Sequence, residues 1–264
     1  IEQIVAAHSR IPVLSIRVNT IKVTMTAYET QLTQAGIDFE HAAEVSDVLF
    51  LSGYSGSPVV LPGFHEGMVY VQDVSSTRVS HVLDPKPGET ILEIGAAPGS
   101  KTTHMAALMA NQGRIVAVDS SEKRLKQLQD NCTRLGVTLV ETMTADAQKS
   151  DSLPTGVNRV LIDAPCSGTG TTGKHPEILL SLKQADLDRY PAIQSRLLTQ
   201  ASQCLQPGGV LVYSTCSIDH AENEGVVRAF LAEHPQWLMQ NEERRLPDAR
   251  QDGFYIARLI APSP

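Results

Sequence analysis

The chain has 264 residues, 42% of them hydrophobic, and a formal net charge of −7. This composition is typical of a globular protein with a sizeable core and excludes a low-complexity or disordered chain. The acidic balance argues against a surface that is basic overall, although a catalytic cleft for nucleic acid needs only a local positive lining.

The sequence contains no run of about 18 apolar residues, and its first ten residues do not resemble a signal peptide. We therefore expect a cytoplasmic protein with no membrane partner. Because the first residue is not Met, we expect a processed chain or part of a longer one that lacks an upstream domain. The four cysteines show no paired spacing, so neither a disulfide framework nor a metal site is expected. Cys132 and Cys204 lie in helix-like stretches and are interpreted as packed side chains.

The first 70 residues predict a small α+β subdomain. Residues 13–20 (VLSIRVNT) have the pattern of a strand, and residues 27–36 (AYETQLTQAG) that of a helix ending at Gly36. Turns rich in glycine and proline follow, as in SGYSGSP and LPGFHEG.

Residues 71–264 predict a second domain, in which strand and helix patterns alternate from about residue 89. Strands are expected at 89–95, 115–119, 138–143, 159–165, 208–216 and 254–262. Helices are expected at 101–113, 121–136, 185–205 and 221–235, with an interruption at Pro191 in the third. This order predicts an α/β, Rossmann-like fold with a mostly parallel sheet, whose ligands bind at the carboxyl ends of the strands.

The stretch LEIGAAPGSKT, residues 92–102, joins the first of these strands to its helix. Glycines at 95 and 99 allow a tight turn, and the helix start offers free N–H groups to a ligand. One interpretation is a phosphate-binding loop of an NTPase, but Ser100 stands where that pattern requires glycine. A purely structural turn is a further alternative.

The other interpretation is a nucleoside cofactor. Asp119 closes the strand IVAVD and stands where Rossmann-type sites place the carboxylate that binds ribose hydroxyls. It could instead cap the next helix, a role that Ser120 or Ser121 could also fill. Asp146 could reach the base of an adenosine or simply form a turn.

Three side chains are expected to converge over the same cleft. Asp163 ends the fourth strand, Cys166 follows it closely, and Cys216 ends the fifth. A thiolate that adds to C6 of a cytosine makes C5 nucleophilic towards an electrophilic methyl group. A carboxyl group whose pKa is raised by burial could assist at N3, and a second thiol could take the C5 proton. The residues themselves do not say which cysteine plays which role.

Four segments in this order, LEIGAAPGSKT, VAVDSSEKRL, IDAPCSGTG and YSTCSIDHAENE, resemble the RNA 5-methylcytosine methyltransferases of the Sun/Fmu group. YVQDVSS, RVNT and LPGFHEG extend the resemblance over most of the chain. It implies a seven-stranded sheet, S-adenosylmethionine as cofactor, Cys216 as nucleophile, Cys166 as the thiol that assists release, and Asp163 as the acid at the cytosine near the methyl donor. It also implies Asp119 at the ribose, Asp146 near the adenine, and a methionine-binding turn made of Gly95, Ala96, Ala97, Pro98, Gly99, Ser100 and Lys101.

The implied partner is RNA, with ribosomal RNA preferred over tRNA, and the chain is expected to act as a monomer. Single-stranded or bulged RNA is the expected target, because a cytosine must leave its stack to be modified. Arg17, Lys22, Lys174 and His175 are candidate phosphate contacts, with solvated surface charges as the alternative. The segment TTGKHPEI has Gly173 where the family has an arginine, so one basic contact is expected to be missing. A nucleic-acid-binding module with an inactive site is a third alternative, beside the methyltransferase and the NTPase.

Overall fold

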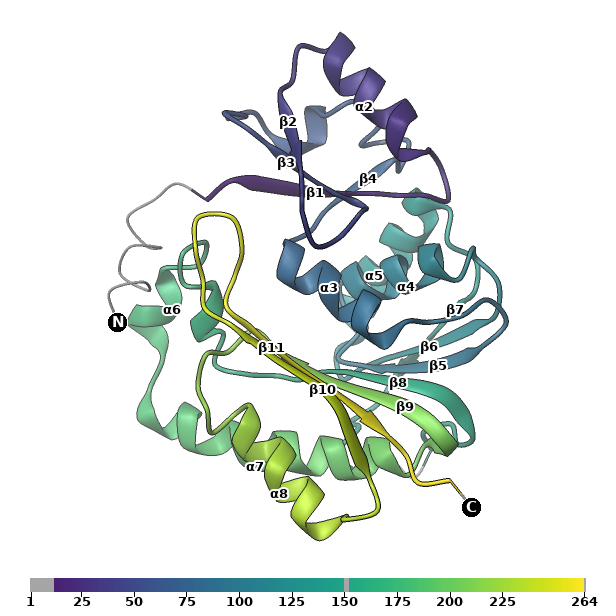
Figure 1. The fold of residues 1–264 in the computed structure, drawn as a ribbon, viewed down its shortest axis with the longest axis vertical. Coiled ribbons are helices and arrows are strands. Elements are labelled where there is room, and N and C mark those ends of the chain that lie inside the picture. Colours follow the sequence, from purple (N-terminus) through teal and green to yellow (C-terminus); the bar gives the residue numbers. More distant parts are fainter. Residues whose placement is uncertain (1–11, 150–151, 264) are drawn as a thin grey trace.

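The computed structural model describes residues 12–149 and 152–263. The chain forms two β-sheets, a small one at the top of Figure 1 and a large one below it. Residues 1–11, which include the segment compared with signal peptides, lie outside the described part.

The small sheet contains four antiparallel strands in the order β2-β3-β1-β4. Its elements are β1 (Leu14–Val18), α2 (Met25–Gln34), β2 (Phe39–His41), β3 (Val48–Leu51), the 3-10 turn η1 (Pro58–Val60) and β4 (Val69–Val71). Tyr28 and Leu32 of α2 pack in a buried cluster with apolar residues of the strands. The strand and helix expected at 13–20 and 27–36 are confirmed. The expected domain boundary at residue 70 falls inside β4.

The large sheet has seven strands in the order β10-β11-β9-β8-β5-β6-β7. They are β5 (Thr90–Ile94), β6 (Arg114–Asp119), β7 (Val140–Thr144), β8 (Val157–Asp163), β9 (Leu205–Thr215), β10 (Leu238–Arg245) and β11 (Phe254–Ile260). The five strands from β9 to β7 are parallel, while β11 runs antiparallel to β9 and β10 antiparallel to β11. The predicted mostly parallel α/β sheet is confirmed.

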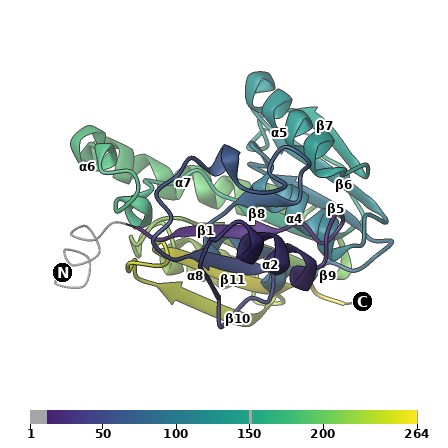
Figure 2. The same ribbon diagram turned by 90° about the horizontal axis from the view of Figure 1, so that it is seen from above.

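Helices cover both faces of the large sheet (Figures 1 and 2). On one face lie α3 (Val74–Leu83), α4 (Ser100–Leu108) and α5 (Glu122–Leu135), and on the other α7 (Gln184–Ser202) and α8 (Glu224–Glu233). The short helices η2 (Thr169–Thr171) and α6 (Glu177–Ser181) follow the end of β8. No helix within the described residues is both long enough and apolar enough to cross a membrane.

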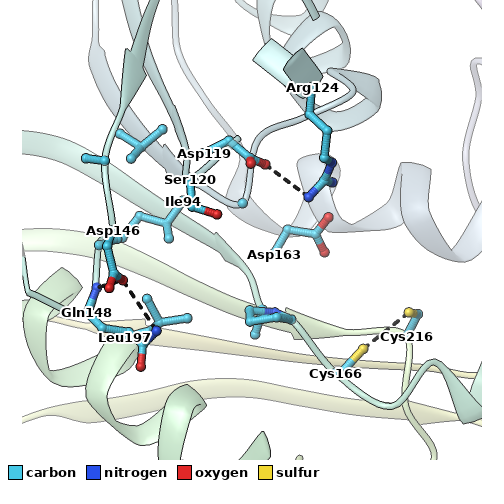
Figure 3. A pocket seen from close by; sticks show the side chains of 16 residues that line it. Ile94, Asp119, Ser120, Arg124, Asp146, Gln148, Asp163, Cys166, Leu197 and Cys216 are labelled. Carbon is cyan, nitrogen blue, oxygen red and sulfur yellow. Dashed lines mark hydrogen bonds and ion pairs between the residues drawn. The ribbon is translucent and has the colours of Figure 1, made fainter. Parts of the chain in front are cut away.

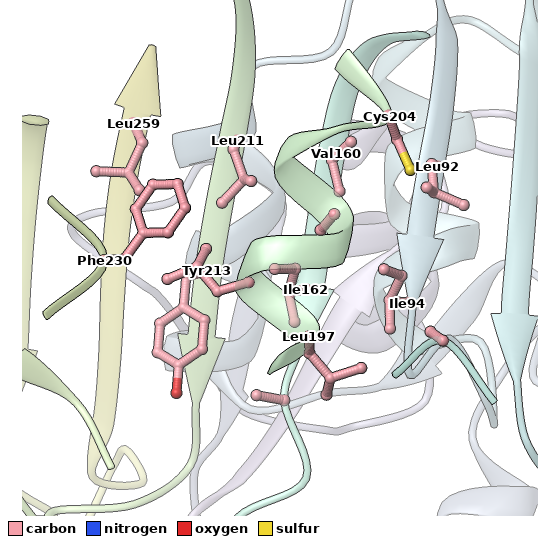
Figure 4. Close-up of a cluster of buried hydrophobic side chains, with 14 of the residues drawn as sticks. Leu92, Ile94, Val160, Ile162, Leu197, Cys204, Leu211, Tyr213, Phe230 and Leu259 are labelled. Atoms are coloured by element: carbon pink, nitrogen blue, oxygen red, sulfur yellow. The ribbon is translucent and has the colours of Figure 1, made fainter. Parts of the chain in front are cut away.

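The alternation of side chains along β5 explains why this strand lies at the centre. Leu92 and Ile94 belong to the apolar cluster under α7 and α8, shown in Figure 4, whereas Ile91 packs under α3 to α5. A strand buried on both faces needs apolar residues at successive positions, which is the pattern of a central parallel strand. Glu93, on the same face as Ile91, is 1% exposed and is the polar exception.

Two features of the large sheet differ from the expectation. The strand pattern does not predict β10, because its sequence LMQNEERR is polar and β10 lies at the edge of the sheet with mostly exposed or half-buried residues. Pro191 does not interrupt α7, which runs from Gln184 to Ser202 with Pro191 in its first half. Pro191 is the eighth of its nineteen residues, so it removes the one backbone N–H bond to the carbonyl of Leu187, and the helix continues past it.

A buried carboxylate joins the region of the small sheet to the large domain. Asp47 precedes β3, and its Oδ1 lies 2.8 Å from Nε2 of His81 in α3. Its Oδ2 lies 2.6 Å from Nε2 of His104 in α4. Burial alone would raise the pKa of Asp47, but the bonds from His104 and His81 hold it well below its ordinary value. Burial, with a contribution from Arg17, lowers the pKa of His104 to about 4.

This arrangement predicts that acid weakens the fold. Between the pKa of His104 in the unfolded chain, about 6.5, and its value of about 4 in the native protein, only the unfolded chain binds the proton. The free energy of unfolding should therefore fall by about 2 kcal/mol from pH 7 to pH 5 through His104 alone. Urea unfolding at both pH values would measure this loss. His104→Gln should make this fall in the free energy of unfolding smaller, whereas His65→Gln, at an exposed histidine, should leave it unchanged. An equally large fall in His104→Gln would show that His104 is not its source.

Candidate active site

A pocket opens at the carboxyl ends of β5, β6, β8 and β9. Six of the residues singled out in the sequence line it, and Figure 3 shows all of them but Gly95 labelled, together with Arg124. The six are Gly95, Asp119, Asp146, Asp163, Cys166 and Cys216. Parallel strands end at the same edge of a sheet, so residues far apart in the chain meet there.

The remainder of the glycine turn lies behind the pocket. Ala96, Ala97, Pro98, Gly99, Ser100 and Lys101 are not among the described residues that line it. Gly99, with φ of 101°, is the N-cap of α4, which begins at Ser100. Gly95 has φ of 78°, and a Cβ built on it would lie 2.2 Å from the backbone oxygen of Asp163. Only glycine therefore allows β5 and β8 to end side by side here.

Gly95→Ala should lower the free energy of unfolding by about 3 kcal/mol, because it combines a left-handed φ with a backbone clash. Gly88→Ala is the matched control, since Gly88 has φ of 87° but no atom within 4 Å of a built Cβ. That variant should cost about 1 kcal/mol from conformation alone. Denaturant unfolding of both proteins measures the difference, and equal losses would show that the contact with Asp163 is unimportant.

Asp119 is held with its carboxylate towards the pocket and is 4% exposed. Its Oδ1 accepts a hydrogen bond of 2.9 Å from the backbone of Ser121, and its Oδ2 lies 3.3 Å from Nη1 of Arg124. Ser121, not Asp119, caps α5. Arg124, which the motif analysis missed, also donates to the carbonyl of Ala97. Arg124 stands in the first turn of the helix that follows Asp119, and a cation so close to a carboxylate in the sequence could have predicted this ion pair.

Asp146 follows β7, lines the pocket and accepts a hydrogen bond of 3.1 Å from the backbone of Gln148. The carboxylate thus forms the turn that was one alternative for it and also faces the pocket. Gln148 and Leu197 complete this side of the pocket and carry no motif in the sequence.

Lys101 occupies a different place from the one expected. Its Nζ lies 2.7 Å from Oδ2 of Asp163 and 5.4 Å from the ring centre of Phe254. Burial disfavours the Lys101 ammonium, but the charge and hydrogen bond of Asp163, with contributions from Cys216 and Glu93, raise its pKa. Because Lys101 is only 5% exposed and already paired, its amine is not presented to a ligand phosphate as an NTPase loop would require.

The contact with Lys101 gives Asp163 a counter-ion. A carboxyl group carries a proton near neutral pH when it is buried without a counter-ion. Here an ammonium group lies 2.7 Å away and the Asp163 side chain is 32% exposed. Asp163 and Lys101 thus form one ion pair at the pocket.

The sulfurs of Cys166 and Cys216 lie 3.3 Å apart, each half-buried (Figure 3). The hydrogen bond with Cys216, together with burial and the charge of Glu222, raises the pKa of Cys166 well above that of an ordinary thiol. The charge of Cys216 in turn contributes to the raised pKa of Lys101. The charge of Lys101 therefore acts on Cys216, whereas Glu222 is bonded to the residues that follow both cysteines. Cys132 and Cys204 are buried elsewhere, as expected.

The four candidate phosphate contacts differ in position. Arg17 is 1% exposed and donates to Oγ1 of Thr103 at 3.0 Å, so this position does not support a phosphate contact. Lys174 is half-buried between Asp73 and Asp252. Lys22 is exposed, and His175 is exposed with Nδ1 3.2 Å from Glu177. The sequence could not distinguish these cases, because burial of a charged residue depends on its tertiary neighbours.

Two protein-family models match this chain. Residues 80–260 match the model of the 16S rRNA methyltransferase RsmB/F family, and residues 1–56 match a ferredoxin-like domain model of RsmF/B-like methyltransferases. A probable ribosomal RNA small subunit methyltransferase B of Synechocystis sp. is 34% identical over 98% of this chain and 62% of its own length. The chain thus spans less than two thirds of that relative.

Two solved structures have the same fold. A methyltransferase homologue from Pyrococcus horikoshii is 30% identical, with a TM-score of 0.86 over 98% of this chain and 90% of that one. NSun6 from the same organism, solved with the S-adenosylmethionine analogue SFG, is 23% identical, with a TM-score of 0.89 over 98% and 93% of the two chains. The chain has the fold of methyltransferases that use S-adenosylmethionine as cofactor. With the family model covering most of its length, it belongs to the RsmB/F family of 16S rRNA methyltransferases.

Proposed function

We propose that this chain transfers a methyl group from S-adenosylmethionine to C5 of a cytosine in RNA, with small-subunit ribosomal RNA as the preferred substrate and tRNA as the alternative. The observation that carries this proposal is the pair of thiols 3.3 Å apart, beside the ion pair of Lys101 and Asp163, in one pocket. Methylation through a covalent pyrimidine adduct needs a nucleophile, a group that assists at N3 and a base for the C5 proton, and two thiols with a carboxylate can supply these.

The chemistry of the pocket fits the cofactor. The carboxylates of Asp119 and Asp146 line it at the ends of β6 and β7 and can accept hydrogen bonds from ribose hydroxyls and an adenine amine. Gly95 allows the backbone to approach at the end of β5. When bound, S-adenosylmethionine supplies an electrophilic methyl group on a sulfonium.

In the proposed reaction Cys216 attacks C6 of the cytosine, and the electrons of the C5–C6 bond make C5 nucleophilic towards the methyl group. Lys101 is suited to stabilise the thiolate, because its charge acts on Cys216. Asp163 accepts from the exocyclic amine and orients the ring, while the ammonium of Lys101 is the proton source for N3 through this carboxylate. This replaces the protonated Asp163 expected from sequence.

Loss of the C5 proton then allows the bond between C6 and Cys216 to break, which restores the aromatic ring. We assign this proton to Cys166, whose sulfur lies 3.3 Å from that of Cys216. Cys166 must first give its own proton to solvent at the pocket, which is the one net proton that the methyl transfer releases. Its raised pKa makes the resulting thiolate a stronger base. The charge of Lys101, which acts on Cys216, supports this order of roles over the reverse.

The test is methylation of defined RNAs with radiolabelled S-adenosylmethionine, followed by nucleoside analysis. We expect 5-methylcytidine in unmodified small-subunit ribosomal RNA and none with Cys216→Ser. A tRNA transcript tests the alternative substrate, and ATP with magnesium tests the NTPase. Methylation at a different atom, or ATP hydrolysis without methyl transfer, would contradict the proposal; tight RNA binding without any transfer would favour an inactive binding module.

A further inference from the structure

Glu222 lies between β9 and α8 and is 0% exposed, and its carboxylate contacts none of the reacting atoms in the reaction proposed above. A buried carboxylate is tolerated only when hydrogen-bond donors replace its lost hydration. Both carboxylate oxygens of Glu222 accept hydrogen bonds, and the donors come from segments far apart in the chain.

The donors belong to the two loops that carry the thiols. Ser167 directly follows Cys166, and it donates to Glu222 with its backbone N–H at 2.9 Å and its hydroxyl at 2.5 Å. Ser217 directly follows Cys216, and its hydroxyl donates at 2.8 Å to Oε1 of Glu222, the oxygen that also accepts from the hydroxyl of Ser167. One carboxylate is therefore bonded to both residues that adjoin the cysteines.

Two neighbours extend this network. Gln194 of α7 donates from Nε2 to Oε2 of Glu222 and to the carbonyl of Pro165, each at 3.0 Å. Asn223 donates to the carbonyl of Ser217 at 2.9 Å and accepts from the hydroxyl of Thr215 at 2.6 Å. Both sides of each cysteine are thus tied to the segment that contains Glu222 and Asn223.

We propose that Glu222 is a positioning residue, which holds the loop of Cys166 and the loop of Cys216 in register so that their sulfurs stay in contact. The effect of Glu222 on the rate of methylation rests on the proposed function, whereas its effect on the distance between the two sulfurs does not. Proton transfer at the adduct requires Cys166 to stay beside the ring bound to Cys216, and a displacement of about 1 Å can cost about 100-fold in rate.

The spacing of the thiols can be tested without RNA or cofactor. Dibromobimane becomes strongly fluorescent only when both of its ends react with neighbouring thiols. The wild-type protein should be cross-linked between Cys166 and Cys216, and Cys166→Ser should remove the signal. Glu222→Ala should reduce the yield at least about tenfold, because both serines lose their shared acceptor.

Glu222→Gln is the conservative variant. Its amide oxygen can accept from the backbone of Ser167 and from Gln194, while its NH₂ can donate to the two serine hydroxyls. It should therefore restore most of the cross-linking that Glu222→Ala loses. In the methylation assay, Glu222→Ala should lower kcat at least about tenfold and leave KM for RNA nearly unchanged.

Glu224→Gln is the matched control in the same segment, because the carboxylate of Glu224 has Arg244 as its ion-pair partner at 3.7 Å, whereas that of Glu222 accepts from Ser167 and Ser217. It should cross-link like the wild type. If Glu222→Ala does not fold, Ser217→Ala removes the bond to the Cys216 loop alone and should also lower the yield. Wild-type cross-linking in a folded Glu222→Ala, or in Ser217→Ala, overturns the inference. A wild-type protein that cross-links normally but does not methylate RNA would refute the proposed function instead.

Discussion

Cys166→Ser should form a covalent complex with RNA that it cannot release, whereas Cys216→Ser should form none. The first change leaves the nucleophile in place but removes the thiol that takes the C5 proton, so the adduct accumulates after methyl transfer. We expect turnover to fall by about 10²–10⁴-fold in Cys166→Ser, the usual contribution of a general base. Without its nucleophile, Cys216→Ser should lose all measurable methylation.

Denaturing gel electrophoresis of protein mixed with labelled RNA and S-adenosylmethionine measures the adduct directly. Cys132→Ala is the control, because this thiol lies in α5, outside the pocket. It should turn over normally without a stable adduct. An adduct in Cys216→Ser and none in Cys166→Ser would reverse the two roles, and the position of Lys101 would then need another explanation.

Lys101→Met should lower kcat by about 100-fold or more while the protein still folds. The variant keeps the length of the side chain in its buried place, but it removes the cation from Asp163 and from Cys216. A thiolate without a nearby cation forms less readily at neutral pH, and loss of one preorganised charge typically costs 10²–10³-fold. The remaining activity should rise with pH, because hydroxide then takes over the formation of the thiolate.

The pH dependence of kcat, together with the rate at which iodoacetamide alkylates Cys216, would measure both effects. Lys126→Met is the control, since Lys126 is exposed on α5 and does not line the pocket. Wild-type kcat in Lys101→Met would show that the ion pair with Asp163 is only structural.

Sequence patterns predicted most of the large sheet. Strands such as β5 and β6 are continuous apolar runs between helices, and that pattern arises from burial on both faces, which is a property of the segment itself. The edge strand β10 escaped prediction because it is not required to be apolar. Likewise the motifs predicted that Asp119, Asp163, Cys166 and Cys216 meet, since all follow strands that end at one edge.

The sequence alone therefore determined the fold class and six of the residues that line the pocket, because both follow from local periodicity and from where polar residues interrupt it. Tertiary structure decided which charges meet: Lys101 pairs with Asp163, Arg17 is buried, and Glu222 joins the two cysteine loops. Except for the bond between Ser217 and Glu222, these contacts join residues separated by more than 50 positions in the sequence. Side-chain direction and burial at such separations depend on how the helices pack on the sheet, which no local pattern encodes.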